Sequence, residues 1–205
     1  PLSRFKFLVS YGDPAPSNKE AKGKSGACYK TVVLLGALDG KLYVINCRLQ
    51  HVVNSEYVEW YYDLEEFVKG KTQVYNYIEN NSLQDPFYEQ VFKPLFMQKG
   101  KEKEYYISIN PDTRKKPDKF ARIEGNLEPL NRNGNLILNE AEKTNPHMMR
   151  LEEQFKAVEP TLSALCDGVD AVEGGWWIIN QKFAARQPQA TVHHSAMRSK
   201  NKHRF

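Results

Sequence analysis

The sequence predicts an α/β domain in which a mixed β-sheet is flanked by helices. Two apolar runs joined by Asp39-Gly40 are typical of an antiparallel hairpin, strand patterns then alternate with helical patterns, and acidic residues directly follow strands. With 205 residues, 40% of them hydrophobic, the chain can form one such domain around a single core.

The first strand is expected at residues 5–11 (FKFLVSY), a short apolar and aromatic run that a Gly-Asp-Pro turn stops. Asp13 therefore stands at the carboxyl end of this strand. A polar loop, the second strand and the third strand are expected in turn at residues 15–25, 29–38 and 41–49. The turn between the last two makes them antiparallel.

A helix is expected at residues 55–68, where aromatic and aliphatic side chains recur at helical spacing. Trp60, Tyr61 and Tyr62 therefore belong to the core rather than to a base-stacking platform. The next strand, helix and strand are expected at residues 72–78, 85–97 and 105–109. Glu79 directly follows the first of these strands.

The last third predicts an added β-hairpin, with strands at residues 128–130 and 136–138 around a turn rich in Asn and Gly. Two helices are expected to follow, at residues 148–158 and 162–179. Periodicity ends near Lys182. We therefore expect a domain at residues 1–181 and a basic, flexible tail at residues 182–205.

The net charge of +4 comes from that tail, since residues 182–205 hold six Lys and Arg and no acid, and it suggests an anionic partner. No apolar run approaches the ~20 residues that span a bilayer, so no membrane contact is expected. The three cysteines are scattered, which favours reduced thiols over disulfides or zinc. The G-x-x-x-x-G-K-[ST] loop of ATP-driven motors is absent from the sequence.

Four acids are candidates for metal chemistry: Asp13, Glu79, Asp167 and Asp170. Phosphodiester hydrolysis with two cations needs carboxylates that converge from separate elements, and an all-oxygen site favours Mg²⁺ or Mn²⁺. Each acid also has a structural alternative: a turn residue for Asp13, a solvated strand end for Glu79 and a helix N-cap for Asp167.

Three stretches carry a resemblance to a known family: residues 11–15 (YGDPA), 77–81 (YIENN) and 166–174 (CDGVDAVEG). Their order and character are similar to those of the C-terminal nuclease domain of the large terminase subunit of tailed bacteriophages, an RNase H-like (RuvC-like) nuclease. The resemblance covers about residues 5–180. It implies that Asp13, Glu79 and Asp167 are catalytic and that they bind, with Asp170, two Mg²⁺ or Mn²⁺ ions.

Two positions depart from the family pattern, because Cys166 and Gly168 stand where the family often has further acids. A second part of the resemblance lies in a K-x-x-R-I element. This element is Lys119 to Ile123 here, and the basic run Arg114-Lys115-Lys116 precedes it. The resemblance implies that Lys116, Lys119 and Arg122 contact DNA phosphates, although a solvated basic loop is the alternative.

The resemblance implies an endonuclease that cuts concatemeric viral DNA during genome packaging with little sequence specificity. Double-stranded DNA, an upstream ATPase motor domain of the same subunit, the portal protein and the small terminase subunit are the expected partners, and the host cytoplasm the expected location. Two alternatives stay open: a Holliday-junction resolvase-like nuclease of the same fold, and a non-catalytic DNA- or portal-binding module.

Overall fold

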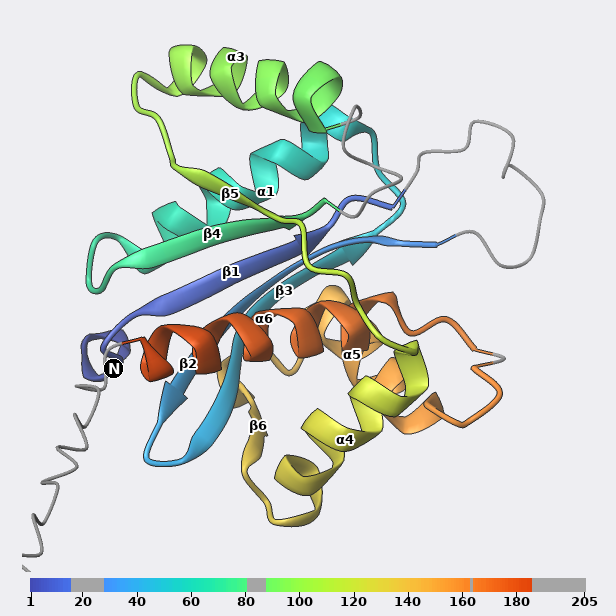
Figure 1. Ribbon diagram of the computed structural model, residues 1–205. Helices are drawn as coiled ribbons and strands as arrows, with labels where there is room; N and C mark the ends of the chain where they lie inside the picture. Colours follow the sequence, from blue (N-terminus) through green and yellow to red (C-terminus); the bar gives the residue numbers. More distant parts are fainter. Residues whose placement is uncertain (16–27, 81–87, 163, 186–205) are drawn as a thin grey trace, which may run out of the picture.

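A six-stranded mixed sheet forms the centre of the molecule in the computed structural model, which describes residues 1–15, 28–80, 88–162 and 164–185 (Figure 1). Its strand order is β5-β4-β1-β2-β3-β6. The strands are β1 (Leu8–Asp13), β2 (Lys30–Leu38), β3 (Lys41–Gln50), β4 (Val74–Glu79), β5 (Ile109–Asp112) and β6 (Leu136–Leu138).

The first three strands are antiparallel, and the later strands join them in parallel. β2 and β3 meet at a turn in which Asp39 and Gly40 have φ values of 51° and 73°, the left-handed pair that a two-residue hairpin requires. The predicted mixed sheet and its hairpin turn are therefore confirmed.

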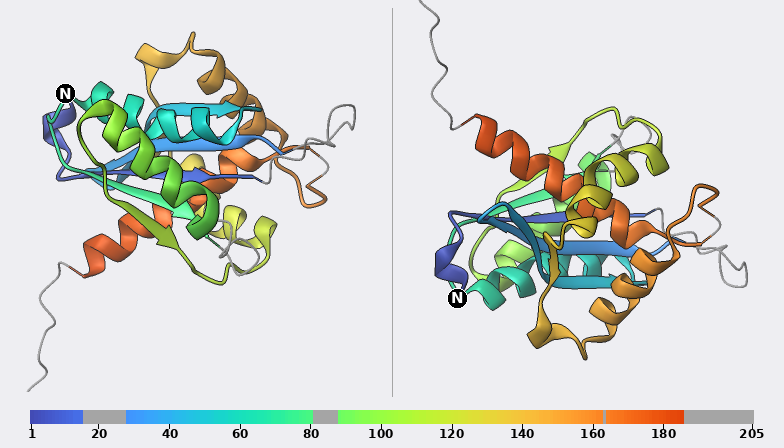
Figure 2. Two further views of the ribbon diagram at one scale, coloured as in Figure 1. Left: turned by 90° about the horizontal axis from the view of Figure 1, so that it is seen from above. Right: turned by 90° about the horizontal axis from the view of Figure 1, so that it is seen from below.

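Helices cover both faces of the sheet (Figure 2). Helices α4, α5 and α6 pack against one face, whereas α1 and α3 pack against the other. The helices are α1 (Asn54–Val68), α3 (Lys93–Lys103), α4 (Lys119–Arg132), α5 (Pro146–Ala157) and α6 (Asp167–Ala184), with short turns η1 (Leu2–Arg4), η3 (Tyr88–Phe92) and η4 (Glu140–Glu142).

Two apolar layers, one on each face, make up the core. Along β1, Val9 and Tyr11 enter the layer beneath α6, whereas Leu8 enters the layer beneath α1, as the two-residue period of a strand requires. Trp60, Tyr61 and Tyr62 lie in the α1 layer and are at most 5% exposed, which confirms their expected place in the core.

The predicted hairpin in the last third is wrong. Residues 128–130 belong to α4, and β6 pairs in parallel with β3 at the edge of the main sheet. The Asp118 side chain caps α4 by accepting a hydrogen bond from the Ala121 N–H, and Ile123 and Leu127 bury one face of the helix. A Glu-Pro-Leu run late in that helix resembled a short strand because three residues show no period.

The fifth strand, β5, begins four residues later than predicted, at Ile109 instead of residue 105. β5 ends at Asp112 and contains Pro111, which reads as a turn residue in sequence. Proline has no N–H to donate within a sheet, but an edge strand tolerates it because β5 has a neighbouring strand on one side only.

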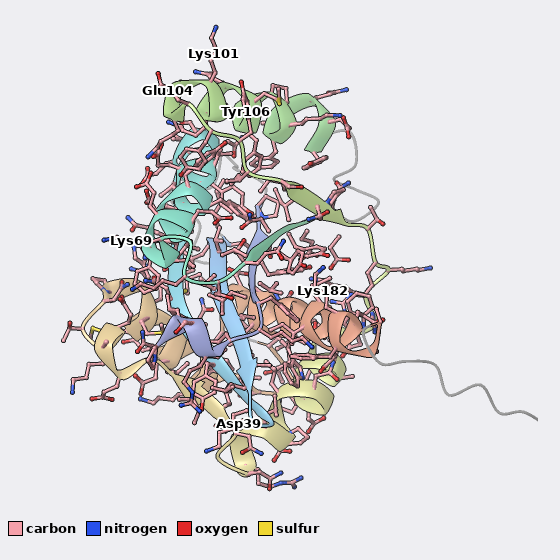
Figure 3. All side chains as sticks on the ribbon, turned by 90° about the vertical axis from the view of Figure 1, so that its left-hand side faces the viewer. Asp39, Lys69, Lys101, Glu104, Tyr106 and Lys182 are labelled. Atoms are coloured by element: carbon pink, nitrogen blue, oxygen red, sulfur yellow. The ribbon has the colours of Figure 1, made fainter. Side chains whose placement is uncertain are left out.

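Helix α6 begins at Asp167, later than the predicted residue 162, and continues to Ala184. Lys182, which the sequence placed in the tail, lies in this helix with its ammonium 3.6 Å from the centroid of the Tyr75 ring on β4 (Figure 3). Residues 186–205 of the predicted tail and 16–25 of the predicted loop lie outside the described residues. Within the described ranges, no helix is long and apolar enough to cross a membrane.

Candidate active site

Three neighbouring strands end in carboxylates on the same face of the sheet. Gly12 of β1 pairs with Ile78 of β4, and Glu79 pairs with Asp112 of β5, so Asp13, Glu79 and Asp112 follow one another across the edge. Side chains two residues apart on a strand point to the same face, and Tyr11 and Tyr77 pack in the α6 layer. Asp13 and Glu79 therefore point toward α6, and so does Asp112, which pairs with Glu79.

Helix α6 brings a second set of acids to this edge. Asp167, Asp170 and Glu173 are three residues apart and therefore lie along one side of the helix, starting at its first turn. All three are buried, with exposed fractions of 4%, 6% and 0%. Asp167 Oδ2 accepts a hydrogen bond of 2.8 Å from the backbone N–H of Tyr29, just before β2.

The pKa of Asp13 reflects its burial and the acids around it. Burial, followed by the negative charges of Glu79 and Asp170, raises the pKa of Asp13 from 3.8 to about 7. Its Oδ1 accepts a hydrogen bond from the Ala15 N–H, which lowers the pKa only in part. Carboxylates from β1, β4 and α6 therefore share one partly desolvated space.

Lys116 reaches into this space from the connector between β5 and α4. Its Nζ lies 2.5 Å from Glu79 Oε2 and 3.6 Å from Asp170 Oδ1, and 5.3 Å from the centroid of the Tyr11 ring. The Lys116 side chain is 10% exposed. The two acids thus share a protein ammonium as their counter-ion.

Two residues of α4 neutralise the acids of α6 from the other side. The Arg122 guanidinium lies 2.5 Å from Asp170 Oδ1, and Lys119 Nζ lies 3.3 Å from Asp170 Oδ2 and 3.8 Å from Asp167 Oδ1. Burial by itself raises the pKa of Asp170, but Arg122 and the two lysines outweigh it and lower the pKa to about 2. Burial raises the pKa of Asp167.

Arg122 also joins α4 to α6. Its Nη1 donates a hydrogen bond of 2.6 Å to Glu173 Oε2, and Asn126 Nδ2 donates one of 2.9 Å to Glu173 Oε1. Arg122 is 8% exposed, so both carboxylates hold it inside the molecule. Lys119, whose side chain is 32% exposed, retains a surface that a DNA backbone can reach.

Comparisons with known proteins identify the fold. No protein-family model matches the chain, and no curated protein matches it in sequence. The human cytomegalovirus terminase nuclease domain matches 91% of this chain and 89% of its own at a TM-score of 0.65 and 15% identity. Its manganese-soaked form matches 85% and 83%, with a TM-score of 0.60 and 14% identity.

The chain has the RNase H-like fold of a terminase nuclease domain. The inhibitor-bound, manganese-soaked form of the cytomegalovirus domain gives the same TM-score of 0.65, at 14% identity over 89% of this chain and 86% of that one. The RNase H-like fold expected from residues 5–180 is therefore confirmed.

Two acids of this site, Asp112 and Glu173, were not predicted as site residues. Asp112 accepts a hydrogen bond of 2.7 Å from the Tyr11 hydroxyl, and Arg114 stacks on Trp177 at 4.2 Å while its Nη2 lies 3.5 Å from Glu173. The spacing of Glu173 after Asp170 was a usable signal for one helix side. Asp112 gave none, because its strand was placed too early.

Lys30 was also missed. It is 3% exposed, its ammonium donates to the Ala15 carbonyl oxygen, and burial lowers its pKa while the charge of Asp13 opposes that shift. The sequence placed it only within the predicted strand at residues 29–38 and gave it no role. In the structure it supplies positive charge on the β2 side of Asp13.

The donor set of this terminase-nuclease fold suits a hard cation. Asp13, Glu79, Asp167 and Asp170 offer only carboxylate oxygens, the ligands that Mg²⁺ and Mn²⁺ prefer. Burial, followed by the charges of Glu79 and Asp170, raises the pKa of Asp13, so a cation beside it would favour the ionised carboxylate. Within the described ranges, however, no three His, Cys, Asp or Glu side chains are grouped as a ready metal site.

Proposed function

We propose that the chain is a metal-dependent endodeoxyribonuclease that cuts concatemeric viral DNA during genome packaging. One observation carries the proposal: Asp13, Glu79 and Asp170 come from β1, β4 and α6 to one edge of a sheet with the fold of a terminase nuclease domain. There burial, followed by the charges of Glu79 and Asp170, raises the pKa of Asp13 to about 7. Carboxylates gathered on separate rigid elements are typical of sites that hydrolyse phosphodiesters with metal ions.

Mg²⁺ or Mn²⁺ is the proposed cofactor, with two ions in the active state. Asp13, Glu79 and Asp167 would be the catalytic ligands, and Asp170 the further ligand. When bound, the cations supply a water activated for attack and neutralise charge on the scissile phosphate. The manganese soaks of the cytomegalovirus domain support this choice of ion.

The chain's own residues orient these ligands. Tyr29 and Ala15 fix one oxygen each of Asp167 and Asp13 through backbone N–H groups. Arg122, anchored on Glu173, fixes Asp170. Arg122 thus acts as a positioning residue more than as a DNA contact.

Lys119 is the proposed phosphate contact among the basic residues near the site. Its partly exposed ammonium stands beside Asp167 and Asp170, where it can bind a backbone oxygen without reading sequence. Lys116 can contact a phosphate as well only when the Lys116 ammonium leaves Glu79 and Asp170. Little sequence specificity is therefore expected.

The remaining partners rest on the resemblance of the sequence to large terminase subunits. We propose that the domain works with an ATPase motor of the same subunit, and with the portal protein and the small terminase subunit. Packaging in the host cytoplasm follows from the same resemblance.

The decisive experiment compares Asp13→Asn with Asp39→Asn in plasmid nicking with Mn²⁺. Both variants remove one carboxylate charge, but Asp39 lies at the β2–β3 turn, 74% exposed and away from the site (Figure 3). We expect the Asp13 variant to lose at least about 100-fold in rate, as removal of a charge-stabilising group does, and the Asp39 variant to cut normally. Nicking by Asp13→Asn at the wild-type rate would refute the assignment.

Substrate choice separates the proposal from the resolvase alternative. A packaging nuclease is expected to cut linear duplex and four-way junctions at similar rates. A strong preference for the junction, measured side by side with equal ends and lengths, would favour a resolvase. Binding of DNA with no cleavage under any divalent cation would favour the non-catalytic module.

A further inference from the structure

Lys116 occupies the space between two of the proposed metal ligands. Its ammonium contacts Glu79 at 2.5 Å and Asp170 at 3.6 Å, and its charge also lowers the pKa of Asp13. These are three of the four carboxylates of the candidate site. A divalent cation that binds these two carboxylates from the side of Lys116 would meet the ammonium, and the two positive charges would repel each other.

We propose that Lys116 is an internal competitor of the metal ion, which holds the resting site in a self-neutralised form and leaves it when the second cation binds. The inference rests on the proposed nuclease function. In this form, carboxylates from β4 and α6 are compensated by a protein cation without a metal ion. The acids are already paired with protein cations.

The position of Lys116 permits such a departure. It lies in the connector between β5 and α4, outside any helix or strand, and its flanking residues Lys115 and Pro117 are exposed. A lysine side chain is a compact charge on a flexible stem. By contrast, Arg122 lies within α4 and is held by Glu173 as well as by Asp170.

Departure also gives the ammonium a second partner. Once the cation neutralises Glu79 and Asp170, the freed ammonium lies beside the groups that would receive a scissile phosphate. The same charge would then compensate acids in the resting protein and DNA in the loaded protein. Metal binding and DNA binding are therefore expected to favour each other.

The test measures Mn²⁺ binding alone, by titration calorimetry on Lys116→Met, Lys115→Met and the wild type. Methionine keeps much of the stem of Lys116 over the Tyr11 ring but removes the charge. We expect Lys116→Met to bind Mn²⁺ at least about tenfold more tightly than the wild type, which corresponds to about 1.4 kcal/mol. A difference of this size is reasonable because the interaction energy of a buried ion pair is larger than that of a surface pair. The matched control, Lys115→Met, removes the same charge from an exposed neighbour and is expected to bind like the wild type.

Thermal unfolding gives a second readout that needs no cleavage. In EDTA, Lys116→Met is expected to melt below the wild type because Glu79 loses the ammonium beside it and Asp170 keeps only Arg122 and Lys119. Mn²⁺ is then expected to raise its Tm by more than it raises that of the wild type. If the methionine variant does not fold, Lys116→Gln, whose amide can donate to Glu79, serves for both measurements.

The possible outcomes separate the two proposals. Equal or weaker Mn²⁺ binding by the neutral Lys116 variants, beside clear binding by the wild type, would overturn the competitor role and leave the nuclease proposal standing. Binding only in the variants would support strong competition. No Mn²⁺ binding in any variant would overturn both.

Discussion

Asp13 shows how one residue gains its chemistry from its neighbours. It ends β1 beside Glu79, and Asp170 approaches from α6. Each neighbour adds negative charge in a space with little water, so ionising Asp13 is costly without a cation. The same cost should lower the stability of the metal-free protein at any pH at which Asp13 is ionised.

The first prediction concerns stability against pH in EDTA. The folded pKa of Asp13, about 7, lies above its ordinary value of 3.8, so the folded chain holds a proton that the unfolded chain releases. The protonated Asp13 therefore contributes to the stability of the folded state, fully below pH ~4, and this contribution is lost as the pH rises through 7. Asp13→Asn, which cannot ionise, should exceed the wild type in unfolding free energy at pH 8 by about 1 to 2 kcal/mol, discounted for partial exposure.

Urea unfolding of both proteins between pH 4 and 8 measures this difference. At pH 4 the two are expected to be nearly equal in stability. Asp39→Asn is the control, and its curve should run parallel to that of the wild type. Parallel curves for Asp13→Asn as well would mean that the site is better solvated than its geometry indicates.

At the scale of elements, α6 approaches the sheet closely enough to place its acids over β1. Glycines permit this approach: a Cβ on Gly174 would lie 2.5 Å from the ring of Tyr11, and one on Gly175 would meet Leu35. Tyr11 is itself fixed by Asp112 on β5. The distance between Asp170 and the strand ends therefore depends on residues that carry no charge.

The second prediction compares two helical glycines. Gly174→Ala is expected to lower the unfolding free energy by about 1 to 3 kcal/mol, because the methyl group forces Tyr11 or α6 to move. Gly125→Ala, on the exposed side of α4 with nothing within 4 Å of a Cβ, is expected to raise it by up to about 1 kcal/mol through helix propensity. Chemical denaturation of both variants provides the measurement.

Each glycine variant serves as the control for the other, because both replace glycine by alanine within a helix. Similar shifts in stability for the two variants would contradict a close contact between α6 and β1. Gly174→Ala should also weaken Mn²⁺ binding, because Asp170 moves with the helix.

At the scale of the whole molecule, the fold gathers the carboxyl ends of β1, β4 and β5 and the amino ends of α4 and α6 at one edge (Figure 1). Ligands of open α/β sheets bind at such an edge. The acids there are largely matched by cations from the β5–α4 connector and α4. The proposed binding of DNA therefore requires positive charge from elsewhere in the chain.

The third prediction assigns that attraction to residues 186–205, which hold five Lys and Arg and no acid. A chain ending at Ala185 is expected to bind duplex DNA more weakly in EDTA and with less salt dependence. The slope of log affinity against log salt should fall by at most about 4 to 5, the limit for five phosphate contacts. Fluorescence anisotropy over a salt series measures it.

A full-length chain with those five residues changed to glutamine is the matched control, because it keeps the length and removes only charge. It is expected to behave like the truncated chain. An unchanged slope in either protein would show that the terminal segment does not contact DNA.

Local signals in the sequence were enough for much of the fold and part of the site. The Asp39-Gly40 turn, the aromatic period of α1 and the strands before Asp13 and Glu79 depend on neighbours a few residues apart, so the sequence alone determined them. The N-terminal acids of α6 were recognisable for the same reason. These features placed three of the four candidate ligands at element ends.

Tertiary structure alone decided what the acids meet. β5 and β6 have four and three residues, too few to show a period, and only pairing with β4 and β3 defines them. The contacts of Lys116 with Glu79 and Asp170 join residues 37 and 54 positions apart. Charge compensation is a long-range property because it depends on distance in space, and sequence patterns record only distance along the chain.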